Sequence, residues 1–235
     1  MRKPRHLPFI RSLYITIMII GLAVPRMALA DANDVPEATS FTSQHWTTGL
    51  HLMAGLGVNT AYFTSSFLKK EAGMGLNINT SVGYYFFNDY AFEVSTNVMF
   101  NRVKRTLIWN TLGTMGLRFR LPPYLAPAKA HPYFKIAAGR GPSVFIVKGK
   151  KPEFFDLGGD RTQIEGDVLS SAYGFFQNSR DGTSWFLELS ATVNSYRKLE
   201  AIRDNKEVPE VIDARIVTDH AAMYAVALTF GVVVF

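Results

Sequence analysis

The chain has 235 residues, of which 48% are hydrophobic and 13% aromatic, and it contains no cysteine. The length suits one large domain or two small ones, and the lack of cysteine excludes a disulfide scaffold. The mean hydropathy of +0.06 is too polar for a bundle of membrane helices, whereas the formal net charge of +6 by itself favours an anionic partner such as nucleic acid.

The first 30 residues have the three parts of a secretory signal peptide. A basic segment is followed by the short apolar run 15–24 and then by the small residues Ala28 and Ala30. A membrane anchor needs ~20 apolar residues, about twice the length of this run. We therefore expect export and cleavage after Ala30.

Removal of this segment changes the charge of the chain. Residues 1–30 hold five of the 25 basic residues and none of the 19 acidic ones, so the mature chain has a net charge near +1. We therefore expect no nucleic-acid partner. The predicted domains are a signal peptide at 1–30, a polar periplasmic lead-in at 31–46 and a β domain at 47–235.

From residue 47 onward, apolar residues alternate with polar or small ones at a period of two, which is typical of β strands. About eight such segments occur, each long enough for the ~9–11 residues of a tilted membrane strand. They are 47–63, 74–87, 90–101, 109–121, 131–147, 168–178, 184–196 and 221–235.

The connectors between these segments differ in length. The odd-numbered ones, at 64–72, 102–107, 148–166 and 195–218, are mostly long and charged, and the even-numbered ones, at 87–90, 122–130 and 178–183, are short and turn-like. Short turns at one end and long loops at the other are typical of outer-membrane barrels. The pattern places the amino terminus at the short-turn, periplasmic end.

A soluble lipocalin-like barrel or a β sandwich would show the same alternation with the apolar face inside. Aromatic residues near strand ends favour the membrane barrel, because they would form a girdle at the bilayer interfaces. They are Tyr62, Phe63, Tyr84, Phe86, Trp109 and Trp185. The predicted fold class is all-β, an eight-stranded antiparallel transmembrane β-barrel in up-and-down meander order, in the bacterial outer membrane.

The segment HPYFKIAAGRG, residues 131–141, resembles the fifth-strand motif of the small OmpA-like outer-membrane β-barrel proteins. This resemblance implies insertion by the outer-membrane assembly machinery, which recognises a carboxyl-terminal strand that ends in an aromatic residue, here Phe235. The apolar alternation just before Phe235 has the opposite parity to this signal. Either a bulge near Gly231 or a last strand that is apolar on both faces would explain the difference.

Charged residues fall on the predicted inner faces of several strands. Because an isolated buried ion is costly, we expect these side chains to pair in a network that fills the lumen, although a narrow conducting path uses the same residues. The residues are Glu93, Arg118, Arg120, Lys135 and Glu188.

Basic residues also cluster in the expected long loops. At the outer rim they would face the phosphates of lipopolysaccharide, although ordinary solvated loop charge gives the same pattern. They are Lys69, Lys70, Arg102, Lys104, Arg105, Lys148, Lys150 and Lys151.

The sequence favours a monomeric structural or surface-interaction protein without a cofactor or metal, whose partners are outer-membrane lipids, lipopolysaccharide and the assembly machinery. The alternatives are a small-solute pore and a lipid A deacylase or acyltransferase. Such an enzyme needs a histidine base beside a serine and an acid. The mature chain's histidines, His45, His51, His131 and His220, do not stand in such a pattern.

Overall fold

The computed structural model describes residues 49–64, 72–87, 89–103, 106–127, 130–147, 161–178, 184–203, 210–216 and 221–234. These residues form nine strands and one short 3-10 helix, η2 (Pro123–Leu125). The strands are β1 (Gly49–Phe63), β2 (Ala72–Phe87), β3 (Tyr90–Val103), β4 (Thr106–Arg120), β5 (Ala130–Val147), β6 (Arg161–Asn178), β7 (Ser184–Arg203), β8 (Glu210–Ile216) and β9 (Ala222–Val234). No helix within the described ranges is long and apolar enough to cross a membrane.

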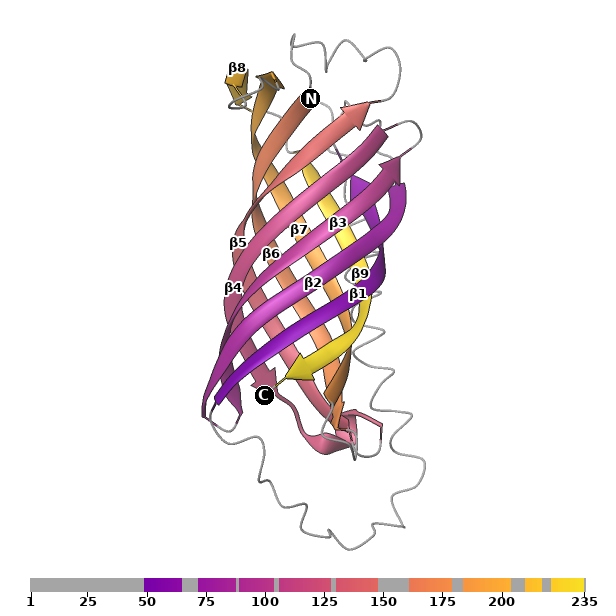
Figure 1. The fold of residues 1–235 in the computed structure, drawn as a ribbon, viewed down its shortest axis with the longest axis vertical. Coiled ribbons are helices and arrows are strands. Elements are labelled where there is room, and N and C mark those ends of the chain that lie inside the picture. The colour runs from indigo at the N-terminus through magenta and orange to yellow at the C-terminus, as the bar shows by residue number, and fades with distance from the viewer. Residues whose placement is uncertain are drawn as a thin grey trace, which may run out of the picture.

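Eight of the strands close into a barrel (Figure 1). Strands β1 to β7 pair antiparallel in sequence order, and β9 pairs antiparallel with both β7 and β1. The predicted eight-stranded antiparallel meander is therefore confirmed. The remaining strand, β8, pairs with β7 beyond the start of β9, at the barrel end drawn uppermost in Figure 1.

The strands are staggered around the barrel. If the pairs are followed from strand to strand, starting at Ala54 on β1, they lead around the barrel to Ala222 on β9. The carbonyl of Ala222 accepts a hydrogen bond from the backbone N–H of Thr64. The path therefore returns to β1, 10 residues beyond its starting point. The residues passed are Thr80, Thr96, Gly113, Arg140, Asp167 and Ser195. Such a stagger goes with strands tilted by ~35–45°, as in small membrane barrels.

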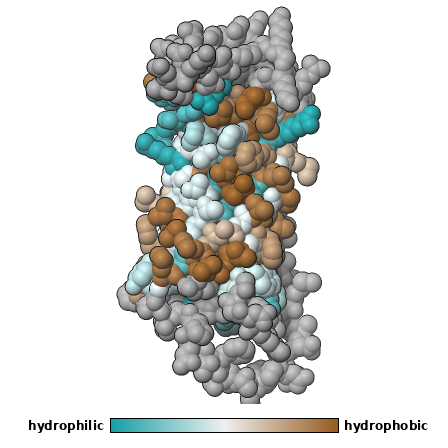
Figure 2. Space-filling view, viewed as in Figure 1, coloured by the Kyte–Doolittle hydropathy of each residue, from teal (hydrophilic) through white to brown (hydrophobic). Residues whose placement is uncertain are grey.

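The outer surface of the barrel is apolar and its interior is small or polar. Leu56, Leu76 and Phe230 are 68%, 62% and 57% exposed on the outside, and apolar patches cover much of the barrel wall in Figure 2. On the neighbouring positions of the same strands, Gly57, Asn77 and Thr229 face the interior. This facing is opposite to that of a lipocalin-like barrel.

One residue of the expected aromatic girdle faces the other way. Phe63 is fully buried and its ring lies edge-on to that of Phe145, 6.4 Å away, because it continues the inward parity of β1. The prediction for Phe63 was wrong. The other aromatics expected there, Tyr62, Tyr84, Phe86, Trp109 and Trp185, lie on the outward positions of their strands.

Several expected loops are partly strand. β6 begins at Arg161 and β7 continues to Arg203, because these two strands pair with each other well beyond the point where the outer surface stops being apolar. β8 lies inside the connector expected at 195–218. The tight connection between β3 and β4 likewise places Arg102 on a strand rather than in a loop.

The last strand has a regular register. β9 pairs with β1 and β7 without a register shift through Gly231, so a bulge there is wrong. Phe230, Val232 and Val234 face outward, whereas Thr229 and Val233 are buried inside. Phe235, the expected signal peptide at 1–30 and the lead-in at 31–46 lie outside the described residues.

Candidate functional site

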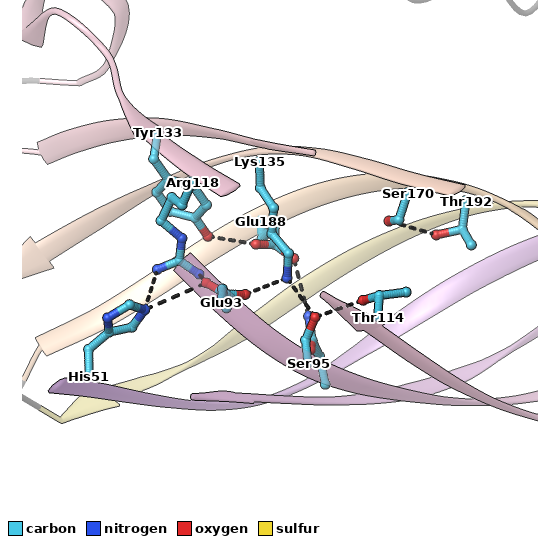
Figure 3. A network of polar contacts seen from close by, with 11 residues as sticks. His51, Glu93, Ser95, Thr114, Arg118, Tyr133, Lys135, Ser170, Glu188 and Thr192 are labelled. Carbon is cyan, nitrogen blue, oxygen red and sulfur yellow. Dashed lines mark hydrogen bonds and ion pairs between the residues drawn. The ribbon is translucent and has the colours of Figure 1, made fainter. Parts of the chain in front are cut away.

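The barrel interior contains a cluster of buried charges centred on Glu93 of β3 (Figure 3). The Glu93 carboxylate forms ion pairs with Arg118 of β4 and Lys135 of β5, and His51 Nε2 of β1 lies 3.5 Å from Glu93 Oε2. All four side chains are buried. We call these residues, together with Glu188 and Tyr133, the lumen cluster.

The strand register and one glycine bring this cluster together. Arg118 and Lys135 are direct partners in the β4–β5 ladder, and Glu93 pairs with Gly83 of β2. Gly83 also pairs with His51, and a Cβ at position 83 would lie 2.3 Å from the His51 ring atom Cε1. The missing side chain at Gly83 therefore gives the imidazole the room that it occupies beside Glu93.

Glu188 of β7 forms the other acidic centre of the lumen cluster. Its carboxylate accepts hydrogen bonds from Tyr133 Oη at 2.8 Å and from Asn79 Nδ2 at 3.2 Å. The Arg118 guanidinium lies 4.5 Å from the centre of the Tyr133 ring, a cation–π distance. Arg118 thus connects the two acidic centres, one by an ion pair and one through the tyrosine ring.

The lumen cluster balances its charges. With both carboxylates ionised, Glu93 and Glu188 offset Arg118 and Lys135. Such pairing is necessary in an interior without bulk water, because several kcal/mol of desolvation per ion must be compensated. Removing one member leaves an uncompensated buried charge, so these four residues depend on one another.

A small polar cavity adjoins the lumen cluster. Lys135 Nζ donates to Ser95 Oγ at 3.0 Å, and Ser95 in turn is hydrogen-bonded to Thr114 at 2.9 Å. The cavity beside them has a volume of about 20 Å³, which is close to the minimum needed for one water molecule. Most of its lining is polar, including Asn79, Asn97, Ser170, Glu188, Ser190 and Thr192.

A chain of uncharged hydrogen bonds crosses the lumen on the side of the cavity toward β8. Tyr196 donates to Ser143, which donates to Asn110; the Asn110 amide donates to Asn101, which donates to Asn59. This chain joins β7, β5, β4, β3 and β1. Because each link has a buried donor and acceptor, it ties together strands that are not all neighbours in the barrel.

Apolar side chains fill both ends of the lumen. Toward the end that carries β8, one buried cluster includes Phe63, Met99, Ile108, Leu112, Phe145, Ile164, Leu199 and Met223. Toward the short-turn end, Met53, Phe176, Phe186 and Val233 pack with the Tyr133 ring. The uncharged hydrogen-bond chain runs through the first of these clusters, which contains Tyr196, so polar and apolar side chains together fill this part of the lumen.

The structure brings together four of the five charges expected in the lumen, Glu93, Arg118, Lys135 and Glu188. Arg120 lies apart from them, half-buried near the end of β4, with its guanidinium 5.7 Å from the Tyr85 ring. The sequence had not pointed to His51 and Tyr133 as members of the cluster. Both have the inward parity of their strands, but neither carries a fixed charge, so the cost of burying an ion, which points to the other four, does not apply to them.

The expected loop cations are mostly outside the described residues. Arg102 is exposed on β3, whereas Lys69, Lys70, Lys104, Arg105, Lys148, Lys150 and Lys151 are not described. The described histidines are His51, inside the barrel, and His131, half-buried at the start of β5. Within the described ranges, the histidine and carboxylate side chains form no group of three that could hold a metal ion.

Comparison with known proteins finds similar folds but no relatives in sequence. No family model matches the chain, and no curated protein matches it. The neisserial surface protein A structure aligns with a TM-score of 0.47 and 13% identity over 79% of this chain and 97% of that one. Ail of Yersinia pestis gives 0.43 and 13% over 78% and 98%, and the outer membrane protein OprG from Pseudomonas aeruginosa gives 0.43 and 10% over 82% and 98%. At these identities the likeness concerns general architecture alone.

Proposed function

We propose that the chain is a bacterial outer-membrane β-barrel of the small, OmpA-like kind, with a closed lumen and a structural or surface-interaction role. The observation that carries this proposal is the facing of the strands, which expose leucine, valine and phenylalanine on the outside and bury paired charges inside. A large continuous apolar exterior is unfavourable in water, but it matches the hydrocarbon core of a bilayer. Barrel closure also pairs the strand edges, as a membrane-spanning sheet requires.

A filled lumen fits a non-conducting barrel. An ion moving along the axis would meet buried apolar clusters and the ion pairs of the lumen cluster. Opening a path would require these buried pairs to separate, which is energetically costly. The pore alternative therefore gains no support from the described interior.

The lipid A enzyme alternative gains no support from the described histidines. His51 is fully buried beside Glu93 and Arg118, inside the wall that would separate it from a lipid on the outer surface. His131 lies at the short-turn end of β5, which the expected topology places on the periplasmic side. We propose that the protein is not an enzyme.

The proposed partners follow from the membrane location. Export by a cleaved signal peptide and insertion by the assembly machinery through Phe235 remain part of the proposal, as does a monomeric state. The basic residues of the long connectors, with Arg102 on β3, would face the phosphates of lipopolysaccharide.

Two measurements test this proposal. The protein should fractionate with outer membranes and migrate faster on gels when unheated than when boiled, because a closed barrel resists detergent unfolding. Recovery in the soluble periplasmic fraction would overturn the membrane location. In planar bilayers the purified protein should give no single-channel currents, and reproducible conductance steps would overturn the closed lumen.

A further inference from the structure

Charged side chains gather on the outer surface where β6 and β7 leave the apolar part of the barrel wall. On β6 the outward positions change from Leu169, which is 56% exposed, to Asp167 and Glu165. Asp167 pairs with Ser195 of β7, and the next exposed residue along β7 is Arg197. On β6 and β7 the apolar-to-polar boundary therefore lies near Asp167, whereas on β5 apolar outward residues continue as far as Ile146.

Asp167 holds two arginines side by side at this boundary. Arg140 Nε of β5 lies 3.4 Å from Asp167 Oδ1, and Arg197 Nη2 of β7 contacts Asp167 Oδ2. The arginine side chains are 82% and 68% exposed, and the Asp167 side chain is 31% exposed. Each contact engages one nitrogen of a guanidinium that has five N–H donors, so Asp167 leaves most donors of both arginines unengaged.

A β-bulge produces this arrangement. Glu165 pairs with Lys198, whereas the next residue, Gly166, pairs with Tyr196, so Arg197 is an extra residue on β7. As a result, Arg197 and Lys198 are both exposed although they are consecutive, while Tyr196 keeps its buried position. Bulges commonly re-aim side chains next to functional sites.

The charges around Asp167 include three cations and three carboxylates. Lys198 forms an ion pair with Glu200 and also interacts with Glu165. Arg140, Asp167 and Arg197 carry a net charge of +1, and Lys198 with Glu165 and Glu200 carries −1, so the group as a whole is neutral while the two arginine side chains are its most exposed members named in these ion pairs. The depression around them has a volume of about 500 Å³ and is lined by Arg140, Pro142, Glu165, Asp167, Arg197 and Lys198.

We propose that Arg140 and Arg197 bind the phosphate group of a lipid in the surrounding outer leaflet. Two guanidinium groups fixed by one carboxylate present planar donor pairs that match phosphate oxygens. The site lies on the outer surface of the barrel, where β6 and β7 change from apolar to charged outward residues, and a lipid headgroup would lie at such a change. This inference rests on the proposed membrane location and assigns a specific lipid contact to it.

A separate apolar groove lies further along the same ladder, on β1, β2, β3 and β9. The ladder that contains Arg140 continues through Gly113, Thr96 and Thr80 to Ala54, so the outward side chains along it are short. The groove, of about 410 Å³, includes Ala54, Thr80 and Thr96 and is otherwise lined mainly by leucine and valine. An acyl chain of a lipid held at the arginines would have to cross Gly113 on β4 to reach this groove.

Lipid titration of the full chain, folded in detergent micelles, tests the proposal. Native mass spectrometry would compare lipid A carrying both phosphates with the same lipid after removal of the phosphates. We expect the wild type to bind the phosphorylated lipid about tenfold more tightly. The double variant Arg140→Gln/Arg197→Gln should bind both lipids equally, at the level of the lipid without phosphates.

Arg140→Lys/Arg197→Lys is the matched control, because it keeps both positive charges and removes the planar guanidinium donors. It should lose most of the wild-type preference, and full retention of that preference would replace the site by diffuse attraction. Equal binding of the two lipids by the wild type would overturn the proposal without any variant. Displacement of the lipid by an equal concentration of inorganic phosphate would indicate a phosphate-ion site and overturn the lipid assignment. If the protein is found in outer membranes but fails these tests, the lipid site is wrong while the proposed membrane location stands.

Discussion

The ring of Tyr133 lies directly over Gly174, its partner in the β5–β6 ladder. A Cβ at position 174 would be 2.5 Å from both Cζ and Oη of the tyrosine. The same ring stacks on Phe176, with centroids 4.5 Å apart, and its hydroxyl donates to Glu188. Gly174 therefore determines where one of the donors to Glu188 can lie.

We predict that Gly174→Ala destabilises the barrel by about 1–3 kcal/mol, because the new methyl group must displace the Tyr133 ring. Urea unfolding in detergent micelles, followed by tryptophan fluorescence, would measure the free energy of unfolding. Gly113→Ala is the control, since the nearest atom to its Cβ would be the Arg140 carbonyl oxygen at 3.7 Å. It should change stability by no more than about 0.5 kcal/mol. Similar losses in both variants would contradict the role given to Gly174.

We predict that Glu93→Gln is more damaging than any outward substitution. It leaves Arg118 and Lys135 buried without their shared carboxylate, and breaking a buried pair in this way costs about 3–5 kcal/mol. The double variant Glu93→Gln/Lys135→Met restores charge balance between Arg118 and Glu188, so it should recover part of this loss. The same unfolding assay measures both, and additive losses would show that Glu93 and Lys135 are not coupled.

The facing of the strands can be tested by single cysteines, because the chain has none of its own. We predict that a membrane-soluble maleimide labels Leu56→Cys, whose position is 68% exposed, when the protein is in lipid vesicles. Ser190→Cys, a close substitute at a position that is 6% exposed inside the barrel, should label only after unfolding. Efficient labelling of Ser190→Cys in the folded protein would contradict a filled lumen.

We predict that β8 is dispensable for barrel closure. β8 pairs with β7 from Lys198 to Arg203, whereas β9 pairs with β7 from Ser184 to Ser195. Replacing residues 204–217 by a flexible linker should therefore leave the heat-dependent gel shift unchanged. Loss of that shift would mean that β8 contributes to the barrel itself. A control deletion within β9 should abolish the shift.

The strand order and the facing of most strands could be predicted from the sequence, because a period of two is maintained wherever one face meets lipid and the other meets the interior. The same reasoning identified Glu93, Arg118, Lys135 and Glu188. The prediction for Phe63 was wrong because it rested on the aromatic side chain near a strand end, whereas the position of Phe63 in the alternation of β1 faces inward. His51 was overlooked because its role depends on Gly83, a contact that only the strand register reveals.

The strand ends beyond the apolar wall could not be predicted in the same way. There both faces are polar, so the alternation is lost although β6 and β7 continue to pair. The bulge at Arg197 breaks the parity as well, and a single extra residue leaves no clear mark in composition. Arg197 therefore fell in the connector expected at 195–218 and Asp167 just before the strand expected at 168–178, whereas Arg140 lay in an expected strand.

The closing contact between β1 and β9 has a consequence for how the barrel forms. Leu52 pairs with Val234, so the ladder is completed by contacts between residues near opposite ends of the described chain. Loop-closure entropy makes such distant pairing slow, and until it occurs β1 and the last strand yet formed are both unpaired edges. Partly assembled forms are thus open sheets that can pair with other chains. Forming the barrel depends on holding β1 unpaired until β9 arrives.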